Sequence, residues 1–115
     1  MTIRSVEDLD VYRRAYRAAL EVFRLSRSFP KEERYSLTDQ LVRSSRSVAA
    51  NIREGFAKRE YESVFSRHLV DALGSAEETQ TCSYLDTEKH QAVIREYGEI
   101  CSMLYALRKN WRKME

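Results

Sequence analysis

The side chains in this 115-residue chain that could most readily bind a ligand are basic. They recur on the faces of predicted helices and near the end of the last one. The candidates for binding phosphate groups are Arg43, Arg46, Arg53, Lys58, Arg59, Arg108, Lys109 and Arg112. If they bind RNA or DNA, the contact is directed at phosphates and weakens with salt. The alternative is a solvated surface, because 20 basic residues are offset by 18 acidic ones.

The other reactive side chains form no recognisable catalytic or metal-binding pattern. His68 and His90 are the only histidines, and neither belongs to the Glu-x-x-His pair of diiron bundles. Cys82 and Cys101 form no CxxC pair, and we interpret them as small hydrophobic residues in a reducing compartment. No glycine-rich phosphate loop or nucleophile elbow is present. The sequence therefore predicts neither an enzyme nor a cofactor. A bundle enzyme that binds a small molecule or a metal is the third and weakest hypothesis.

The composition is typical of a helical, cytoplasmic protein. Hydrophobic residues make up 43% and charged residues 33% of the chain, with one proline and three glycines. Residues 1–5 contain no apolar signal core, and no apolar run approaches the length of a membrane span. We expect residues 1–115 to form a single domain.

Four segments with helical periodicity must position the candidate residues. We predict helices over approximately residues 6–28, 36–58, 61–85 and 87–113. Ser5 and Asp8 form a capping pair at the start of the first predicted helix. Asp86-Thr87-Glu88 offers an N-terminal cap for the fourth. Pro30 ends the first segment, whereas only Gly55 punctuates the boundary between the second and third.

Apolar residues three and four positions apart predict an all-α, antiparallel up-and-down four-helix bundle. The seam of the third segment contains Phe65, Leu69, Ala72, Ala76 and Thr79. The seam of the fourth contains Val93, Tyr97, Ile100, Leu104, Leu107 and Trp111. The short connections favour antiparallel neighbours.

The first segment carries more apolar surface than a bundle helix needs. One seam contains Leu9, Tyr12, Tyr16, Ala19 and Phe23. A second, smaller seam contains Val11, Ala15, Ala18 and Val22. Together they cover roughly 220° of the helix, against a stripe somewhat over 100° in an ordinary bundle. We therefore predict that the second seam is a self-association surface, and that Ala18→Glu weakens the assembly without unfolding the subunit.

The second segment combines small residues with an apolar stripe between residues 44 and 56. Ser44, Ser47, Ala50 and Gly55 would allow a neighbouring helix to approach closely. Asn51 and Glu54 lie in the same stretch and could contact a ligand or RNA. We favour a structural role for both, because their spacing supports packing and supplies no partner chemistry.

Several motifs, in order and spacing, resemble the four-helix-bundle family encoded in intervening sequences of bacterial 23S ribosomal RNA genes. They are Leu9-Asp10-Val11-Tyr12, Phe29-Pro30, Leu37-Thr38-Asp39-Gln40-Leu41, Ala50-Asn51-Ile52-x-Glu54-Gly55-Phe56 and Leu73-Gly74-Ser75-Ala76. The resemblance covers approximately residues 9–107 and marks Ala50, Asn51, Ile52, Glu54, Gly55 and Gly74 as structural motif residues. Two departures are Ala49, where proline is common, and Cys82-Ser83, where Gln-Leu is usual.

The resemblance implies a ring-like homopentamer without established enzymatic activity. A related group, the accessory variability determinants of diversity-generating retroelements, consists of basic pentamers that work with a reverse transcriptase and nucleic acid. We therefore expect a non-enzymatic, homo-oligomeric scaffold or accessory protein whose partner is RNA, DNA or a nucleoprotein. The alternative is a protein–protein interaction module that binds no nucleic acid.

Overall fold

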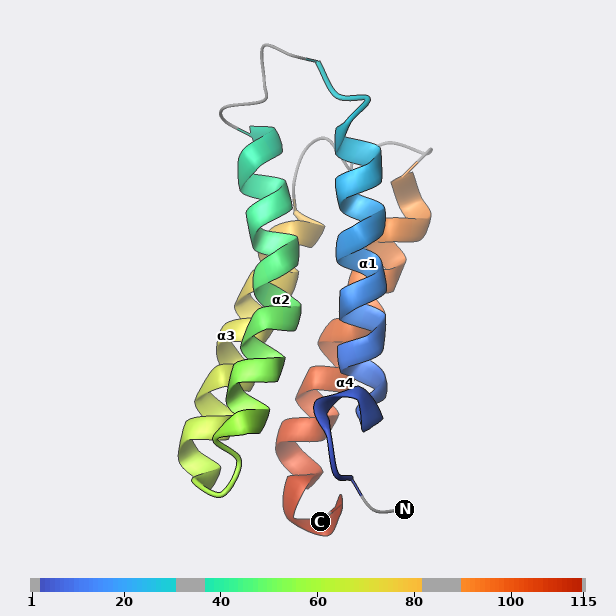
Figure 1. The fold of residues 1–115 in the computed structure, drawn as a ribbon. Coiled ribbons are helices and arrows are strands. Elements are labelled where there is room, and N and C mark those ends of the chain that lie inside the picture. The colour runs from blue at the N-terminus through green and yellow to red at the C-terminus, as the bar shows by residue number, and fades with distance from the viewer. Residues whose placement is uncertain (1–2, 31–36, 82–89, 115) are drawn as a thin grey trace.

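The computed structural model describes residues 3–30, 37–81 and 90–114 and shows an all-α fold (Figure 1). A single 3-10 turn, η1 (Val6–Asp8), precedes four helices. They are α1 (Asp10–Ser26), α2 (Asp39–Ala57), α3 (Glu62–Gln80) and α4 (Gln91–Met114). No strand occurs in this described part of the chain, so the predicted all-α class is confirmed.

The four helices alternate in direction and pack as a square bundle. The chain ascends α1, descends α2, ascends α3 and descends α4 in the view of Figure 1. Helix α1 packs against α2 and α4, and α3 packs against the same two helices from the other side. The groove between α1 and α2 therefore faces away from the surface shared by α3 and α4.

The first predicted helix is divided at Leu9. The Asp8 carboxylate accepts hydrogen bonds from the backbone N–H groups of Arg4 at 2.8 Å and Ser5 at 3.0 Å, as the predicted capping pair requires. Leu9 then adopts an extended conformation with φ −84° and ψ 118°. Only 3% of Leu9 is exposed, so the break places this side chain in the core.

The apolar seams predicted for the third and fourth segments face the core. All eleven seam residues of α3 and α4 are buried. At the end of the bundle near the α2–α3 turn, Phe65 and Trp111 pack edge to face, with ring centroids 4.7 Å apart. Phe56 joins them at 6.4 Å from Phe65 and 6.3 Å from Trp111. Aromatic packing thus ties α2, α3 and α4 together at this end.

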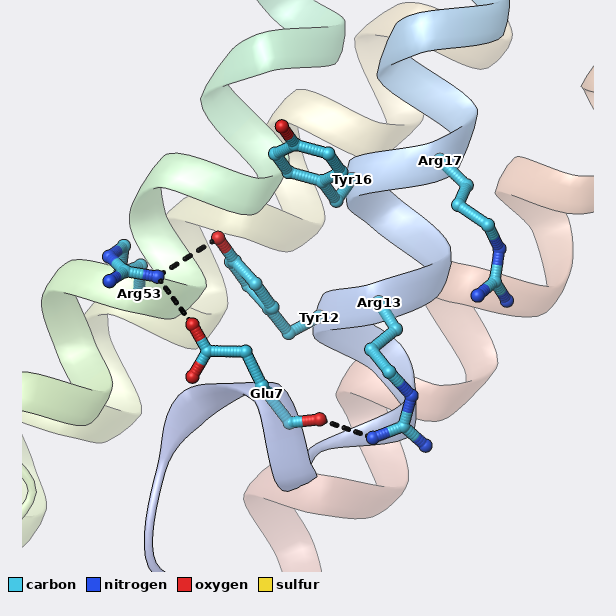
Figure 2. Close-up of a pocket in the computed structure, with 6 residues that line it drawn as sticks. All are labelled: Glu7, Tyr12, Arg13, Tyr16, Arg17 and Arg53. Atoms are coloured by element: carbon cyan, nitrogen blue, oxygen red, sulfur yellow. Dashed lines mark hydrogen bonds and ion pairs between the residues drawn. The ribbon is translucent and has the colours of Figure 1, made fainter.

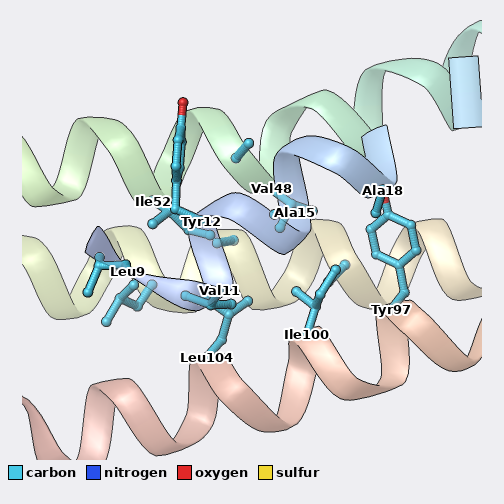
Figure 3. Packing of buried hydrophobic residues seen from close by; sticks show 14 of the residues in the cluster. Leu9, Val11, Tyr12, Ala15, Ala18, Val48, Ile52, Tyr97, Ile100 and Leu104 are labelled. Atoms are coloured by element: carbon cyan, nitrogen blue, oxygen red, sulfur yellow. The ribbon is translucent and has the colours of Figure 1, made fainter. Parts of the chain in front are cut away.

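The prediction that the small seam of α1 lies on the surface is wrong, whereas the other seam is divided, with Leu9 and Tyr12 buried and Tyr16 and Phe23 exposed. Val11, Ala15, Ala18 and Val22, expected to form the self-association surface, are 3%, 0%, 7% and 0% exposed. Figure 3 shows Val11 and Ala15 among residues of α2 and α4 such as Val48, Ile100 and Leu104. Small side chains let α1 approach both neighbours closely, so they fill the core and leave no surface for a partner. The bulkier Tyr16 and Phe23 lie outside instead.

Some predicted features lie outside the described residues. These are the cap at residues 86–88, the end of the third predicted helix beyond residue 81, and Cys82-Ser83. The boundary between the second and third helices is described and is a turn over residues 58–61, in which the Tyr61 N–H donates to the Lys58 carbonyl at 3.0 Å. Gly55 does not form this turn, because it lies buried within α2.

Candidate interaction surfaces

The small polar residues of α2 form a ladder of side-chain hydrogen bonds with α3. The Ser44 and Thr79 hydroxyls are 2.8 Å apart, and both residues are buried. One turn further along, the Ser75 hydroxyl donates to Ser47 Oγ at 2.9 Å. Each small side chain brings the helices close enough for these direct bonds. The ladder favours one register of α2 against α3, because a shift by one residue would break these hydrogen bonds between the helices.

Asn51 continues this ladder and has no free polar atom for a ligand. Its Nδ2 donates to the Ser47 carbonyl at 3.0 Å and lies 3.1 Å from Ser47 Oγ. Its Oδ1 lies 3.2 Å from Nδ1 of His68 on α3. These contacts support a structural role. Glu54 is exposed and pairs with Lys58, with Nζ and Oε1 3.3 Å apart.

The other motif residues have different surroundings. Ile52 is fully buried, and Ala50 lies on the surface between α1 and α2. Gly55 lies against α3, where an added Cβ would be 2.6 Å from the His68 Cβ and 3.1 Å from Phe65 Cδ1. Gly74 is exposed, and a Cβ there would meet no atom within 4 Å. The subunit packing therefore accounts for Gly55 but not for Gly74.

An apolar groove lies between α1 and α2, and we call it the α1/α2 groove. It has a volume of about 430 Å³. Its lining comprises Tyr12, Tyr16, Ala19, Leu20, Phe23, Arg46, Ala49, Ala50 and Arg53. Three large side chains on α1 remain substantially exposed there, with Tyr16 at 53%, Leu20 at 56% and Phe23 at 44%. Sequence reasoning missed Leu20 because it belongs to neither seam of α1.

Two of the predicted phosphate-binding arginines lie along this groove. The Arg46 guanidinium carbon is 5.4 Å from the centroid of the Phe23 ring. Arg53 Nη1 donates to Tyr12 Oη and to Glu7 Oε1, each at 3.2 Å (Figure 2). These hydrogen bonds, led by the one to Tyr12, raise the pKa of Arg53. Both cations are thus held beside aromatic rings on α1.

The groove continues into a second hollow near η1. Figure 2 shows Arg13 and Arg17 of α1 there, with Arg13 donating to the Glu7 carbonyl oxygen. Tyr12, Tyr16 and Arg53 line both hollows. An apolar strip with basic side chains at its margin therefore runs along the α1 and α2 side of the bundle.

The remaining basic candidates lie elsewhere and mostly contact their own chain. Arg43 Nε is 3.1 Å from Asp39, near the start of α2. The others lie along the end of the bundle that contains the α2–α3 turn and the last turns of α4 (Figure 1). There Arg59 covers the Phe56 ring at 4.1 Å, and Arg112 bonds to Glu62 at 2.8 Å. The structure thus divides the candidates among three regions, which are the α1/α2 groove, the start of α2 and this end of the bundle, so the candidates form no single basic surface.

The same end of the bundle carries two further candidates. Arg108 Nε donates to Ser66 Oγ at 2.8 Å. Lys109 is exposed on the following position of α4. Together with Lys58, Arg59 and Arg112, these residues bring basic groups from two distant parts of the sequence to one end.

No reactive centre emerges from the described residues. Residues 3–30, 37–81 and 90–114 contain no group of three or more His, Cys, Asp or Glu side chains that could hold a metal ion. Burial, together with the nearby Glu77 carboxylate, raises the pKa of Cys101 to about 11, so its thiol is protonated at neutral pH. Among the described helices, none is both long and apolar enough to cross a membrane.

The fold and these surfaces define a four-helix-bundle protein with an apolar groove along one side and basic side chains at one end. The family model for the 23S rRNA-intervening sequence protein matches residues 7–106, and the chain belongs to this family. The family has no known enzymatic role. No curated protein matches the chain. The family assignment confirms the resemblance that the motif order indicated.

Proposed function

We propose that this protein is a non-enzymatic, homo-oligomeric scaffold or accessory protein that self-associates through the α1/α2 groove. The observation that carries the proposal is the exposure of Tyr16, Leu20 and Phe23 along one continuous groove. Burying apolar surface contributes about 25 cal/mol per Å², and soluble monomers seldom leave such groups clustered in water. Five subunits is the number that the family resemblance implies.

The test is the mass of the assembly in light scattering coupled to size exclusion. Leu20→Glu places a charge in the middle of the groove, and we expect its mass to fall toward the 13.6 kDa of one subunit. Its helical circular dichroism should be retained, because Leu20 is 56% exposed in the subunit. Val64→Glu is the matched control, since Val64 is a 37% exposed residue of α3 outside the groove. A Leu20→Glu variant with the wild-type oligomeric mass would contradict the proposal.

A second candidate function is binding of nucleic acid at the basic end of the bundle. The specific observation in its favour is that the end of α2, followed by Lys58 and Arg59, lies at the same end of the bundle as the last turns of α4, which carry Arg108, Lys109 and Arg112. Their ion pairs are exposed, so a phosphate can exchange with a carboxylate at little cost. An oligomer would present this basic end once per subunit, so the modest positive charge of one subunit would be multiplied over the assembly.

This second function is tested by the anisotropy of labelled single-stranded RNA and duplex DNA over a salt series. We expect the logarithm of the affinity to fall linearly with the logarithm of the salt concentration. Lys109→Glu together with Arg112→Glu should weaken binding at least about tenfold and reduce the salt slope. Arg43→Glu, near the other end of α2, is the control. Absence of salt-sensitive binding would favour the alternative of a protein–protein interaction module.

A further inference from the structure

Gly74 in the middle of α3 has no packing explanation within the subunit. A Cβ at this position would have open space on every side, and the backbone φ is negative. Glycine in a helix interior nevertheless costs about 0.5–1 kcal/mol relative to alanine. At Gly55 the close approach of His68 explains the glycine. A partner packed closely against the outside of α3 would explain Gly74 in the same way.

Exposed apolar side chains lie beside Gly74, on a surface that we call the α3/α4 face. It comprises Val70, Leu73, Gly74, Glu77, Cys101 and Tyr105. Val70 precedes Gly74 by one helical turn and is 42% exposed, while Tyr105 on α4 is 62% exposed. Leu73 and Cys101 are partly buried against the core beneath them. Burial and the nearby Glu77 carboxylate of α3 raise the pKa of the Cys101 thiol on α4, so these two side chains lie close together across this face.

The charges of the groove and of helix α3 are complementary. Helices α1 and α2 together carry seven arginines and four acidic residues, with Arg46 and Arg53 at the groove itself. Helix α3 carries four acidic residues and one arginine. Helix α4 carries five basic and two acidic residues, but none from Ile100 to Leu107, the stretch that contributes Cys101 and Tyr105 to the α3/α4 face. The two surfaces face in opposite directions, because α1 and α3 pack on α2 and α4 from opposite sides. A second copy of this chain thus presents a surface suited to the groove in both polarity and charge.

We propose that the α3/α4 face of one subunit docks into the α1/α2 groove of a second copy. The contact is heterologous, because each subunit uses its groove toward one neighbour and its α3/α4 face toward the other. Such contacts propagate head to tail and can close into a ring. Gly74 provides the close approach, and the acidic side chains of α3 meet the arginines that border the groove. This inference rests on the proposed self-association and names the surface that the groove binds.

The test combines two variants that each block one surface. Leu20→Glu blocks the groove, and Val70→Arg with Gly74→Leu blocks the α3/α4 face by adding bulk and a charge that the groove arginines repel. Both changes in the second variant lie at exposed positions with room in the subunit, so its helicity and melting temperature should be retained. Each variant alone should have the mass of one subunit. Val64→Arg, about 120° around α3 from Val70, is the control and should keep the wild-type mass.

Mixing the two blocked variants separates a head-to-tail contact from a symmetric one. The groove variant keeps its α3/α4 face and the face variant keeps its groove, so the mixture should form dimers with about twice the subunit mass. Absence of dimers on mixing overturns this inference. The inference is also overturned if the variant with Val70→Arg and Gly74→Leu, or either substitution alone, retains the full wild-type oligomeric mass. The groove would then bind another surface. A monomeric wild-type protein overturns the proposed self-association itself.

Discussion

At the scale of single residues, the two motif glycines have opposite surroundings. Gly55 is buried where α2 meets α3, and Gly74 is exposed with no neighbour near its Cα hydrogen. The sequence presents both as glycines within helical periodicity. Their roles differ because the neighbouring helix occupies the Cβ position at only one of them.

This difference predicts opposite effects of the same substitution. Gly55→Ala should lower the free energy of unfolding by about 1–3 kcal/mol, because the new methyl group overlaps the His68 Cβ. Gly74→Ala should raise it by about 0.5–1 kcal/mol through higher helix propensity. Urea unfolding in the Leu20→Glu background measures both effects on the subunit alone. An unchanged midpoint for Gly55→Ala would show that α3 moves aside freely, contrary to the packing described.

Asn51 also belongs to the residue scale, and its contacts limit what it can do. Its amide nitrogen bonds to Ser47 and its amide oxygen faces the His68 ring. A ligand would have to displace one of these interactions within the α2–α3 contact. The arginines beside the groove, by contrast, keep exposed guanidinium groups, so the surface between α1 and α2 is the better place for recognition.

At the scale of elements, α1 shows the limit of hydrophobic periodicity. Both seams fit a helix, and burying the one with larger side chains would remove more apolar surface from contact with water. The smaller seam is nevertheless inside, because α1 lies close to both α2 and α4 and the space between them suits valine and alanine. Of the larger residues, Leu9 and Tyr12 reach the core, whereas Tyr16 and Phe23 stay exposed along one edge, where the Arg46 guanidinium lies over the Phe23 ring.

The rotation of α1 reverses the expected effect of Ala18→Glu. Ala18 is 7% exposed, so a carboxylate there is buried without a designed partner and should lower the free energy of unfolding by roughly 2–5 kcal/mol. Leu20→Glu, two residues away on the exposed side, should change the unfolding free energy of the subunit by less than about 1 kcal/mol. Thermal unfolding followed by circular dichroism compares the two. Equal melting temperatures would contradict the assignment of inside and outside on α1.

At the scale of the whole molecule, the bundle gathers residues that are far apart in the sequence. The turn after α2 and the last turns of α4 meet at one end, where Arg112 bonds to Glu62. The α1/α2 groove and the α3/α4 face lie on opposite sides because four antiparallel helices pack as a square. Two opposed surfaces are what a head-to-tail assembly requires, so the arrangement of helices connects the fold with the proposed self-association.

The sequence by itself determined the helical class, the core seams of α3 and α4 and the family, because periodicity and motif order are local properties of the chain. Close packing of α2 was also predictable from its small residues. Only the tertiary structure decided which seam of α1 is buried, which glycine is crowded and which basic residues share a surface. Periodicity defines angles around one helix axis, whereas these outcomes depend on how each helix is rotated and placed against its neighbours.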